Sequence, residues 1–255
     1  MRKPIFAFAA LAALVAAPAI AADAPLPYRS PATYTSVSNW TGPYAGFSIG
    51  YLSGTVVETP EAVAPDIFLD RLNPKGFVGG VQLGYNVRLG RSGMAGLETD
   101  FQLASITGSR SIDWCPGCTA YGISVTETQR VKVPWFGTTR LRVGFLPWDK
   151  LLVYATGGVA YGKVNATSTT DVAYNFDWFS YQYQSRATTS RFAVGWTAGV
   201  GAEWAFAQNW RAKAEYLYMD LGVTEARYAD TFGYAYASSV RAQNHLLRFG
   251  VNYAF

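Results

Sequence analysis

Apolar and polar side chains alternate in eight separate stretches of the chain. In the stretch GFVGGVQLGYNVRLG, which spans 76–90, the odd positions include Phe77, Val81, Leu83 and Tyr85, whereas the even positions are mostly glycine or polar. Alternate residues of a strand point to opposite faces, so this stretch predicts a strand with one apolar face and one small or polar face. The same alternation predicts further strands at about 40–54, 95–104, 130–145, 151–162, 191–206, 209–221 and 241–255.

The connections between the predicted strands alternate in length. Short connections span 91–93, 147–150 and 207–209, whereas the other four run to about twenty residues or more. This rhythm is typical of outer-membrane barrels, which have short periplasmic turns and longer extracellular loops. A soluble β-sandwich is the alternative, but it predicts no such rhythm and would bury its apolar faces. The sequence therefore predicts an all-β, eight-stranded antiparallel transmembrane barrel with four long extracellular loops. We expect its first and last strands to pair, because hydrocarbon tolerates no free sheet edge.

The N-terminal segment has the features of a secretory signal peptide. Arg2 and Lys3 precede an apolar run that is too short to span a bilayer, and small residues follow it. We expect a cleaved signal peptide at 1–22, with its cleavage region at Ala19, Ala21 and Ala22. The proline-containing stretch 23–39 is then predicted to be a flexible periplasmic leader, and 40–255 the barrel.

Composition by itself fits either a secreted β-sandwich or an outer-membrane barrel, and the alternation decides between them. Charged residues make up only 15% of the chain and aromatic residues 16%, whereas a soluble domain is usually about one quarter charged. The net charge of +4 falls to +2 when Arg2 and Lys3 are removed with the signal peptide (4 − 2), so we expect no nucleic-acid partner. Aromatic residues near the short turns predict an inner girdle at the headgroup level, made of Trp40, Tyr44, Trp148, Trp204, Trp210 and Tyr253.

Charged residues gather on the face that alternation assigns to the barrel lumen. They are Arg88, Glu98, Asp100, Lys132, Arg140, Arg142, Glu203, Arg211, Lys213, Glu215 and Arg248. Buried charges must be paired or solvated, so we expect a network of salt bridges with trapped water. The surplus of three basic residues (7 − 4) would favour anions in any leak. Two interpretations stay open, a polar plug that holds the strands in register and a narrow path for small solutes, and the narrow bore of eight strands favours the plug.

Candidate chemical groups outside the lumen are few. Cys115 and Cys118 lie in the second long loop, where an exported chain is expected to form a small disulfide rather than a zinc or redox site. His245, the one histidine, is expected to face outward without a nucleophile beside it, so we predict no enzyme activity, no cofactor and no metal site. The third and fourth long loops are rich in aromatic residues, which either extend the strands above the membrane or form a recognition surface.

Several motifs together resemble a known family. WTGPYAGFSIGY, PWFGTTRLRVGF, LLVYATGGVAYG, KAEYLYMDLG and the terminal LLRFGVNYAF are similar to the small outer-membrane β-barrel proteins of alphaproteobacteria, the porin family or major outer-membrane proteins of rhizobia and brucellae. The resemblance covers about 40–255. It implies an abundant, surface-exposed OmpA-like barrel with no shared catalytic residues. The family's proposed roles are envelope integrity, host interaction, small-solute passage and, for some members, haem binding. The alternating terminal residues resemble the signal read by the barrel-assembly machinery: Phe249, Val251, Tyr253 and Phe255.

These observations lead to three ranked hypotheses about function. The first is a structural and surface protein of the bacterial outer membrane that supports envelope integrity, with at most limited pore activity. The second is a porin for passive diffusion of small hydrophilic solutes, and the third is loop-mediated binding of a ligand or host molecule, such as haem or an adhesion partner. The expected partners are outer-membrane lipid and lipopolysaccharide, and the assembly machinery during insertion. The sequence leaves the oligomeric state open, with a monomer as one candidate.

Overall fold

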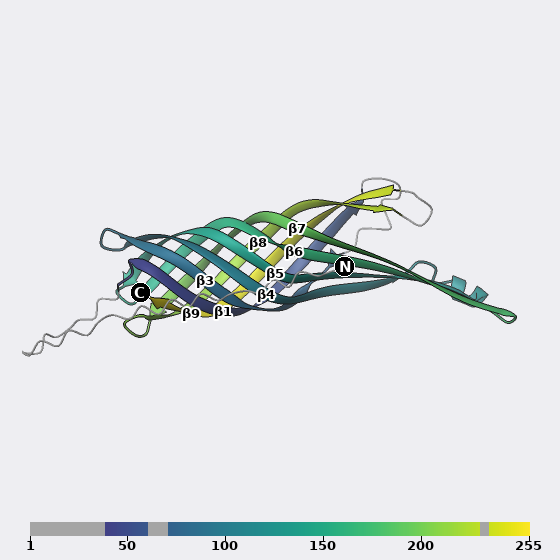
Figure 1. Cartoon of the computed structure of the whole chain (residues 1–255), viewed down its shortest axis with the longest axis horizontal. Helices are drawn as coiled ribbons and strands as arrows, with labels where there is room; N and C mark the ends of the chain where they lie inside the picture. Colours follow the sequence, from purple (N-terminus) through teal and green to yellow (C-terminus); the bar gives the residue numbers. More distant parts are fainter. Residues whose placement is uncertain (1–38, 61–70, 230–234) are drawn as a thin grey trace, which may run out of the picture. The chain divides into compact units, whose positions relative to one another are not determined.

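Eight long antiparallel strands form a closed ring in the computed structural model, which describes residues 39–60, 71–229 and 235–255. The elements are β1 (Gly42–Pro60), β2 (Arg71–Leu72), β3 (Lys75–Leu89), β4 (Gly93–Asp113), the 3₁₀ helix η1 (Cys118–Tyr121), β5 (Ile123–Trp148), β6 (Leu151–Phe176), β7 (Phe179–Ala205), β8 (Trp210–Ala229) and β9 (Ala235–Ala254). Each strand pairs with the next, apart from the two-residue β2 at the edge of β1, and β1 pairs with β9. The register from Tyr44–Ala254 to Pro60–Ser238 therefore closes the predicted eight-stranded barrel (Figure 1).

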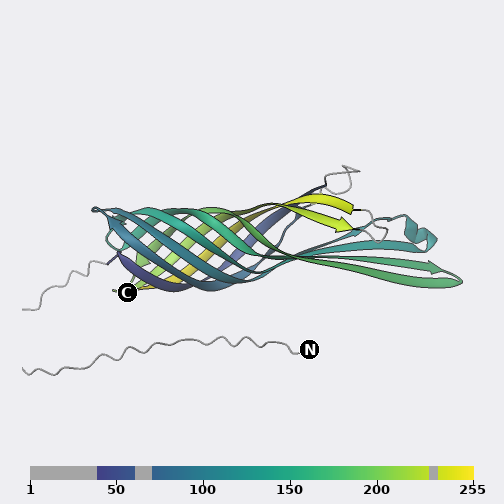
Figure 2. The same ribbon diagram turned by 45° about the horizontal axis from the view of Figure 1, so that its top comes forward.

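The two ends of the barrel differ in the way that the connection lengths predict. β3–β4, β5–β6 and β7–β8 are joined by tight turns at one end, and the long connections lie at the other. Three of the predicted long connections are largely strand. β6 and β7 stay paired from Leu151–Trp204 to Phe176–Phe179, so only Asp177 and Trp178 form the turn. Paired strands therefore project well beyond the ring (Figure 2). Within the described ranges, no helix is long and apolar enough to cross a membrane.

The outer face of the ring is apolar. Phe77 is 74% exposed, Leu141 67% and Phe192 62%, and these side chains alternate with buried ones along their strands. Exposed apolar surface on this scale indicates contact with something other than water. Part of the predicted aromatic girdle is wrong, because Trp40 and Tyr44 turn into the bore, whereas Trp148, Trp204 and Trp210 face outward.

The bore contains layers of large apolar side chains as well as charges, whereas the alternation predicts an inner face of small or polar residues. On the side of the projecting strands, the inward layer is Leu52, Val78, Ile106, Phe136, Ala160, Leu217, Met219 and Leu246. At the short-turn end, a second layer consists of Trp40, Met94, Leu146, Leu152, Tyr154 and Ala205. The register places the charged side chains between these layers. For example, Gly50 pairs with Arg248, and the next inward pair joins Leu52 to Leu246.

Candidate functional site

Eight buried charged residues meet in the middle of the bore and form one network, which we call the ionic layer. It consists of Glu98 and Asp100 from β4, Arg140 and Arg142 from β5, Glu203 from β7, Lys213 and Glu215 from β8, and Arg248 from β9. Strand alternation aims these side chains inward, and the closed ring then holds five strands around one centre. All eight side chains are almost completely excluded from solvent.

Glu98 is the hub of the ionic layer. Its carboxylate lies 2.5 Å from Arg140, 2.7 Å from the Lys213 Nζ, 3.2 Å from Arg142 and 3.2 Å from Arg248. Four cations from three strands therefore surround one carboxylate. A charge in a low-dielectric interior is tolerated only when it is compensated in this way, so Glu98 joins the opposite walls of the barrel.

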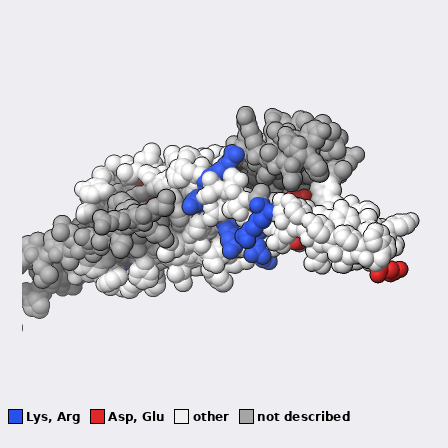
Figure 3. All heavy atoms as spheres, turned by 45° about the vertical axis from the view of Figure 1, so that its right-hand side comes forward, with Lys and Arg blue, Asp and Glu red and all other residues white. Residues whose placement is uncertain are grey.

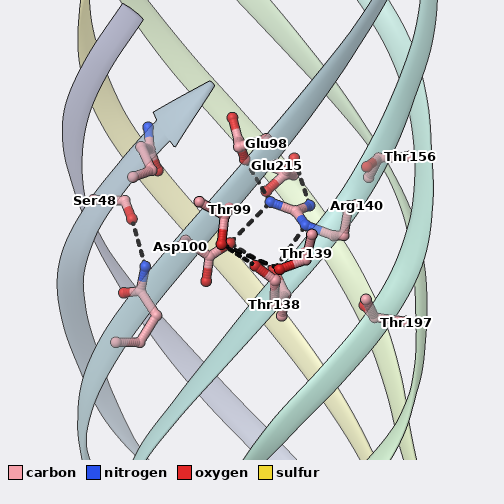
Figure 4. Close-up of polar contacts among 12 residues, drawn as sticks. Ser48, Glu98, Thr99, Asp100, Thr138, Thr139, Arg140, Thr156, Thr197 and Glu215 are labelled. Atoms are coloured by element: carbon pink, nitrogen blue, oxygen red, sulfur yellow. Dashed lines mark hydrogen bonds and ion pairs between the residues drawn. The ribbon is translucent and has the colours of Figure 1, made fainter. Parts of the chain in front are cut away.

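Arg140 extends the network toward the apolar layer on the projecting side. Its guanidinium contacts Asp100 at 3.0 Å and Glu215 at 3.0 Å, and its Nε donates to Thr138 at 2.8 Å (Figure 4). Thr138 donates in turn to Asp100 at 2.6 Å. From β5, the Arg140 guanidinium thus contacts β4 and β8, and the Thr138 hydroxyl contacts β4. These contacts fix the register between the three strands.

Arg142 is enclosed by two tyrosine rings. Its guanidinium carbon lies 3.9 Å from the centre of the Tyr154 ring and 5.6 Å from that of Tyr44, and its nitrogens also donate to Glu203 and to the Tyr44 hydroxyl. Each ring lies across a glycine on the neighbouring strand, Tyr44 over Gly84 and Tyr154 over Gly201, where a Cβ would collide with the ring. These two glycines are required because the rings occupy the space of a side chain.

Arg211 is buried as predicted but lies outside the ionic layer. It stacks on Trp40, with its guanidinium carbon 4.4 Å from the ring centre, and donates to the Asn39 carbonyl oxygen. The Trp40 indole nitrogen donates to the carbonyl of Asp149 at 2.9 Å. Asn39 and Trp40, just before β1, therefore lie at the short-turn end of the bore.

The lumen assignment of Lys132 is wrong, and Arg88 lies at the edge of the bore. Arg88 is the second-last residue of β3, on the inward face with the buried Asn86, but it is only half-buried, and its guanidinium donates to the Arg91 carbonyl in the adjoining turn at 3.2 and 2.5 Å. β5 has a bulge at Val133 and Pro134, between Lys132 and Trp135. The extra residue shifts the alternation by one, so residues on the Lys132 side of the bulge point to the opposite face from the one that the pattern after it predicts. Lys132 therefore faces outward and is exposed. The proline inside the run was the sequence signal for this bulge, because strand prolines concentrate at bulges and edges.

Charge balance follows from this correction. The ionic layer holds four basic and four acidic residues (4 − 4 = 0), and with the buried Arg211 the predicted lumen residues carry a surplus of one (5 − 4) instead of three. The basis for anion preference in a leak is thereby reduced. The ionic layer is electrically neutral, its charges are paired with one another, and an apolar layer lies on each side of it. It therefore links the strands of the barrel wall across the bore.

The other predicted residues lie apart from the bore. Cys115 and Cys118 are joined by a disulfide, with their Cα atoms 5.2 Å apart. His245 is exposed, and its Nδ1 lies 2.6 Å from the Tyr216 hydroxyl. Phe249 and Phe255 are 56% and 69% exposed on the outer face. The predicted cleavage residues, and all of the predicted leader except Asn39, lie outside the described residues. Within the described ranges, no group of three or more His, Cys, Asp or Glu residues could hold a metal ion.

A closed antiparallel ring with an apolar exterior and a paired, charged interior defines a small membrane β-barrel. Comparison with known sequences agrees, since residues 7–255 match the outer membrane protein beta-barrel domain. The chain belongs to this family.

Two relatives come from brucellae. The 31 kDa outer-membrane immunogenic protein of Brucella melitensis is 37% identical over 97% of this chain and 98% of its own. The 25 kDa outer-membrane immunogenic protein of Brucella abortus is 23% identical over 94% of this chain and 90% of its own. The resemblance to alphaproteobacterial outer-membrane barrels is therefore confirmed, and so is the outer-membrane location.

Solved structures with a similar fold include OprG of Pseudomonas aeruginosa, at 11% identity and a TM-score of 0.45, which covers 86% of this chain and 100% of that one. Ail, the attachment invasion locus protein of Yersinia pestis, is 16% identical with a TM-score of 0.35, covering 83% and 99%. In an outer-membrane barrel the tight turns are periplasmic, so the projecting strands are extracellular.

Proposed function

We propose that this protein is a structural and surface component of the outer membrane whose bore is closed, so that it supports the envelope and conducts at most a small leak. The observation that supports this function best is the ionic layer. Side chains from five strands meet at its centre, and an apolar layer lies on each side of it. An ion that crossed the barrel would have to separate these pairs and pass both apolar layers. Eight strands enclose a bore that side chains are able to fill.

Single-channel recording tests the closed bore. Refolded full-length mature protein in a planar bilayer should show no discrete conductance steps. The double variant E98A/R248A should show them, because it removes a carboxylate and a guanidinium that lie 3.2 Å apart in the bore. The matched control K132A/E127A removes one charge of each sign from β5 outside the ionic layer and should remain silent. Regular steps from the unaltered protein would establish the porin hypothesis instead.

A strain that lacks the protein distinguishes the envelope-support hypothesis from the porin hypothesis, because the two predict different changes in outer-membrane permeability. Loss of an envelope-supporting protein should increase the entry of an apolar fluorescent dye through the weakened outer membrane. Loss of a porin should instead slow the uptake of small hydrophilic solutes and leave dye entry unchanged. Complementation with the unaltered chain should reverse whichever effect is seen.

A second candidate function, recognition at the cell surface, is favoured by an aromatic ladder at the tip of the β6–β7 hairpin. The rings of Tyr174, Phe176, Trp178, Phe179 and Tyr181 follow one another at centroid distances of 5.9–6.4 Å. Trp178 is 85% exposed. Exposed aromatic clusters are common at binding surfaces. Haem and an adhesion partner are the candidates, and a haem absorbance titration of the unaltered protein against W178A/F179A tests the first of them.

We also propose that the last strand is read during assembly. Phe255 lies at the end of an outward row with Tyr253, and the two rings are 5.2 Å apart. Deleting Phe255 should sharply reduce insertion in cells, while protein refolded in detergent keeps its stability, because the ring is exposed and leaves the bore untouched. Heat-modified mobility on gels measures both. Normal insertion of the truncated chain would contradict a role for Phe255 in assembly.

A further inference from the structure

A hollow on the outward side of the barrel wall is lined by basic side chains. It lies over β5, β6 and β7, has a volume of about 350 Å³, and is bordered by Arg130, Lys132, Lys163 and Arg186, which we call the basic patch. Figure 3 shows lysine and arginine side chains gathered where the barrel wall passes into the projecting strands. None of these residues belongs to the ionic layer.

The basic patch lacks the acidic partners that the bore provides. Its remaining lining residues are Asn165, Thr167, Thr188 and Ser190, so no carboxylate borders the hollow. None of the four cations forms an ion pair with a carboxylate of the described residues. Like charges that face one another on a sheet are destabilising. Their gathering on one surface therefore points to an anionic ligand.

The patch begins at the upper edge of the apolar exterior. Lys163 pairs directly with Trp135 on β5 and with Phe192 on β7, and the centres of these two tilted rings are 6.1 Å apart. Phe101 stacks on Trp135 at 5.6 Å. Aromatic rings at such a boundary mark the headgroup level of a membrane. The cations thus lie at and just beyond the outer surface of the hydrocarbon.

Strand register sets the height of the patch. Lys132 pairs with Asn165, Arg130 with Thr167, and Arg186 with Thr169. From Lys163 to Thr169 is six residues along β6, or roughly 20 Å along the strand. A strip of that length is long enough to contact several phosphate groups. The bulge at Pro134 is essential to it, because it turns Lys132 outward onto the same face as Trp135 and Lys163.

We propose that the basic patch binds the phosphate groups of lipopolysaccharide in the outer leaflet. Lysine and arginine are the residues that bind phosphate, and hydroxyl and amide donors of the kind that line the rest of the hollow complete such sites. The acyl chains of the same molecule would lie below, against Trp135 and Phe192. A soluble anion gains nothing from these rings, which is why we assign the site to a lipid.

Binding of lipid A to the full-length mature protein in detergent tests the proposal. Native mass spectrometry counts bound lipid, using bis-phosphorylated lipid A and its dephosphorylated form as probes. The unaltered protein should retain the phosphorylated form and discriminate against the other. K132Q/K163Q should bind it about 25-fold more weakly, from roughly fivefold for each cation near an anionic surface. The matched control R91Q/K150Q removes two exposed cations at the short-turn end and should bind within about twofold of the unaltered protein.

Three further measurements make the test decisive. K132R/K163R keeps the charge and should bind like the unaltered protein, and a gel-shift assay shows that each variant is folded. Inorganic phosphate at millimolar concentration should leave lipid A bound, which distinguishes a lipid site from a free phosphate site. Equal retention of both forms of lipid A, or unchanged binding by K132Q/K163Q, would overturn the proposal. If heparin bound the protein and displaced lipid A, and if this binding depended on Lys132 and Lys163 in the same way, the assignment of the basic patch to a lipid would be overturned.

Discussion

β6 and β7 pass through two regions that share one continuous hydrogen-bond ladder but differ in what surrounds it. Within the ring, these strands contribute Tyr154 and Glu203 to the packed bore, where both side chains are buried. In the projecting hairpin, residues 165–190, many side chains on both faces are exposed. Its cross-strand side-chain contacts include Thr167–Thr188 and Ser190–Asn165, and rings stack along the strand itself. The ladder is therefore sufficient to continue a strand but does not by itself build a core.

The difference shows where stability resides. In the ring, removing one side chain leaves buried charges or a cavity, and such losses are large. In the projecting hairpin, water replaces most lost contacts, so changes there should be small. Regions with few buried contacts are also those that open first and that tolerate variation. A surface protein thus keeps a rigid wall while its extracellular hairpins are free to change.

The largest expected effect comes from a Glu-to-Gln exchange made in each region. Glu98→Gln should lower the free energy of unfolding by about 3–5 kcal/mol, because four cations lose their shared buried carboxylate. Glu127→Gln, in the extended part of β5, loses a charged acceptor for Trp114 and Ser168 at 3.0 and 2.9 Å and should cost under about 1 kcal/mol. Urea unfolding in detergent measures both. Equal losses would abolish the distinction between the regions.

Two glycine substitutions compare how tightly the inner and outer faces of the barrel wall are packed. Gly201→Ala places a methyl group against the Tyr154 ring, which Glu215 fixes by a 2.9 Å hydrogen bond, and should cost about 1–3 kcal/mol. Gly157→Ala has its nearest neighbour at 3.6 Å and should change stability by less than about 0.5 kcal/mol. The same unfolding experiment compares them. A neutral Gly201→Ala would show that the ring moves aside and that the bore is less tightly packed than the contacts indicate.

The smallest effect is expected from removing the hairpin tip. Replacing residues 170–185 with an Asn-Gly turn joins Thr169 to Arg186, which are already paired, and deletes the aromatic ladder. The free energy of unfolding should stay within about 0.5 kcal/mol of the unaltered value. Lipid A binding should also persist, since the basic patch is retained. A loss as large as that of Glu98→Gln would place the projecting strands within the cooperative fold.

Most of the barrel was predictable from the sequence because the governing rules are local. Period-two alternation identified the ring strands, and the connection lengths identified the two ends. Strand lengths were underestimated, since 151–162 became Leu151–Phe176. The extracellular extensions lie in stretches that were expected to be loops, and they are strands because each one pairs along its length with a neighbouring strand.

The candidate site was predicted only in part. Alternation gave the inward direction of Glu98, Arg140 and Arg248, because the face of a residue depends on its position along one strand. It failed for Lys132, because a bulge reverses the faces beyond it, and it did not show that Arg88, near the end of β3, would bond to the adjoining turn and stay outside the ionic layer.

The sequence alone determined that one face of each strand is apolar and that the chain must close into a ring, since hydrocarbon leaves no other way to satisfy the backbone. Only the tertiary structure decided which charges meet. Glu98 and Arg248 are 150 residues apart and touch at 3.2 Å. Such contacts depend on the stagger of all eight strands around the bore, and no local pattern records that stagger. The same holds for the balanced ionic layer, for the apolar layers that flank it and for the basic patch on the outer wall.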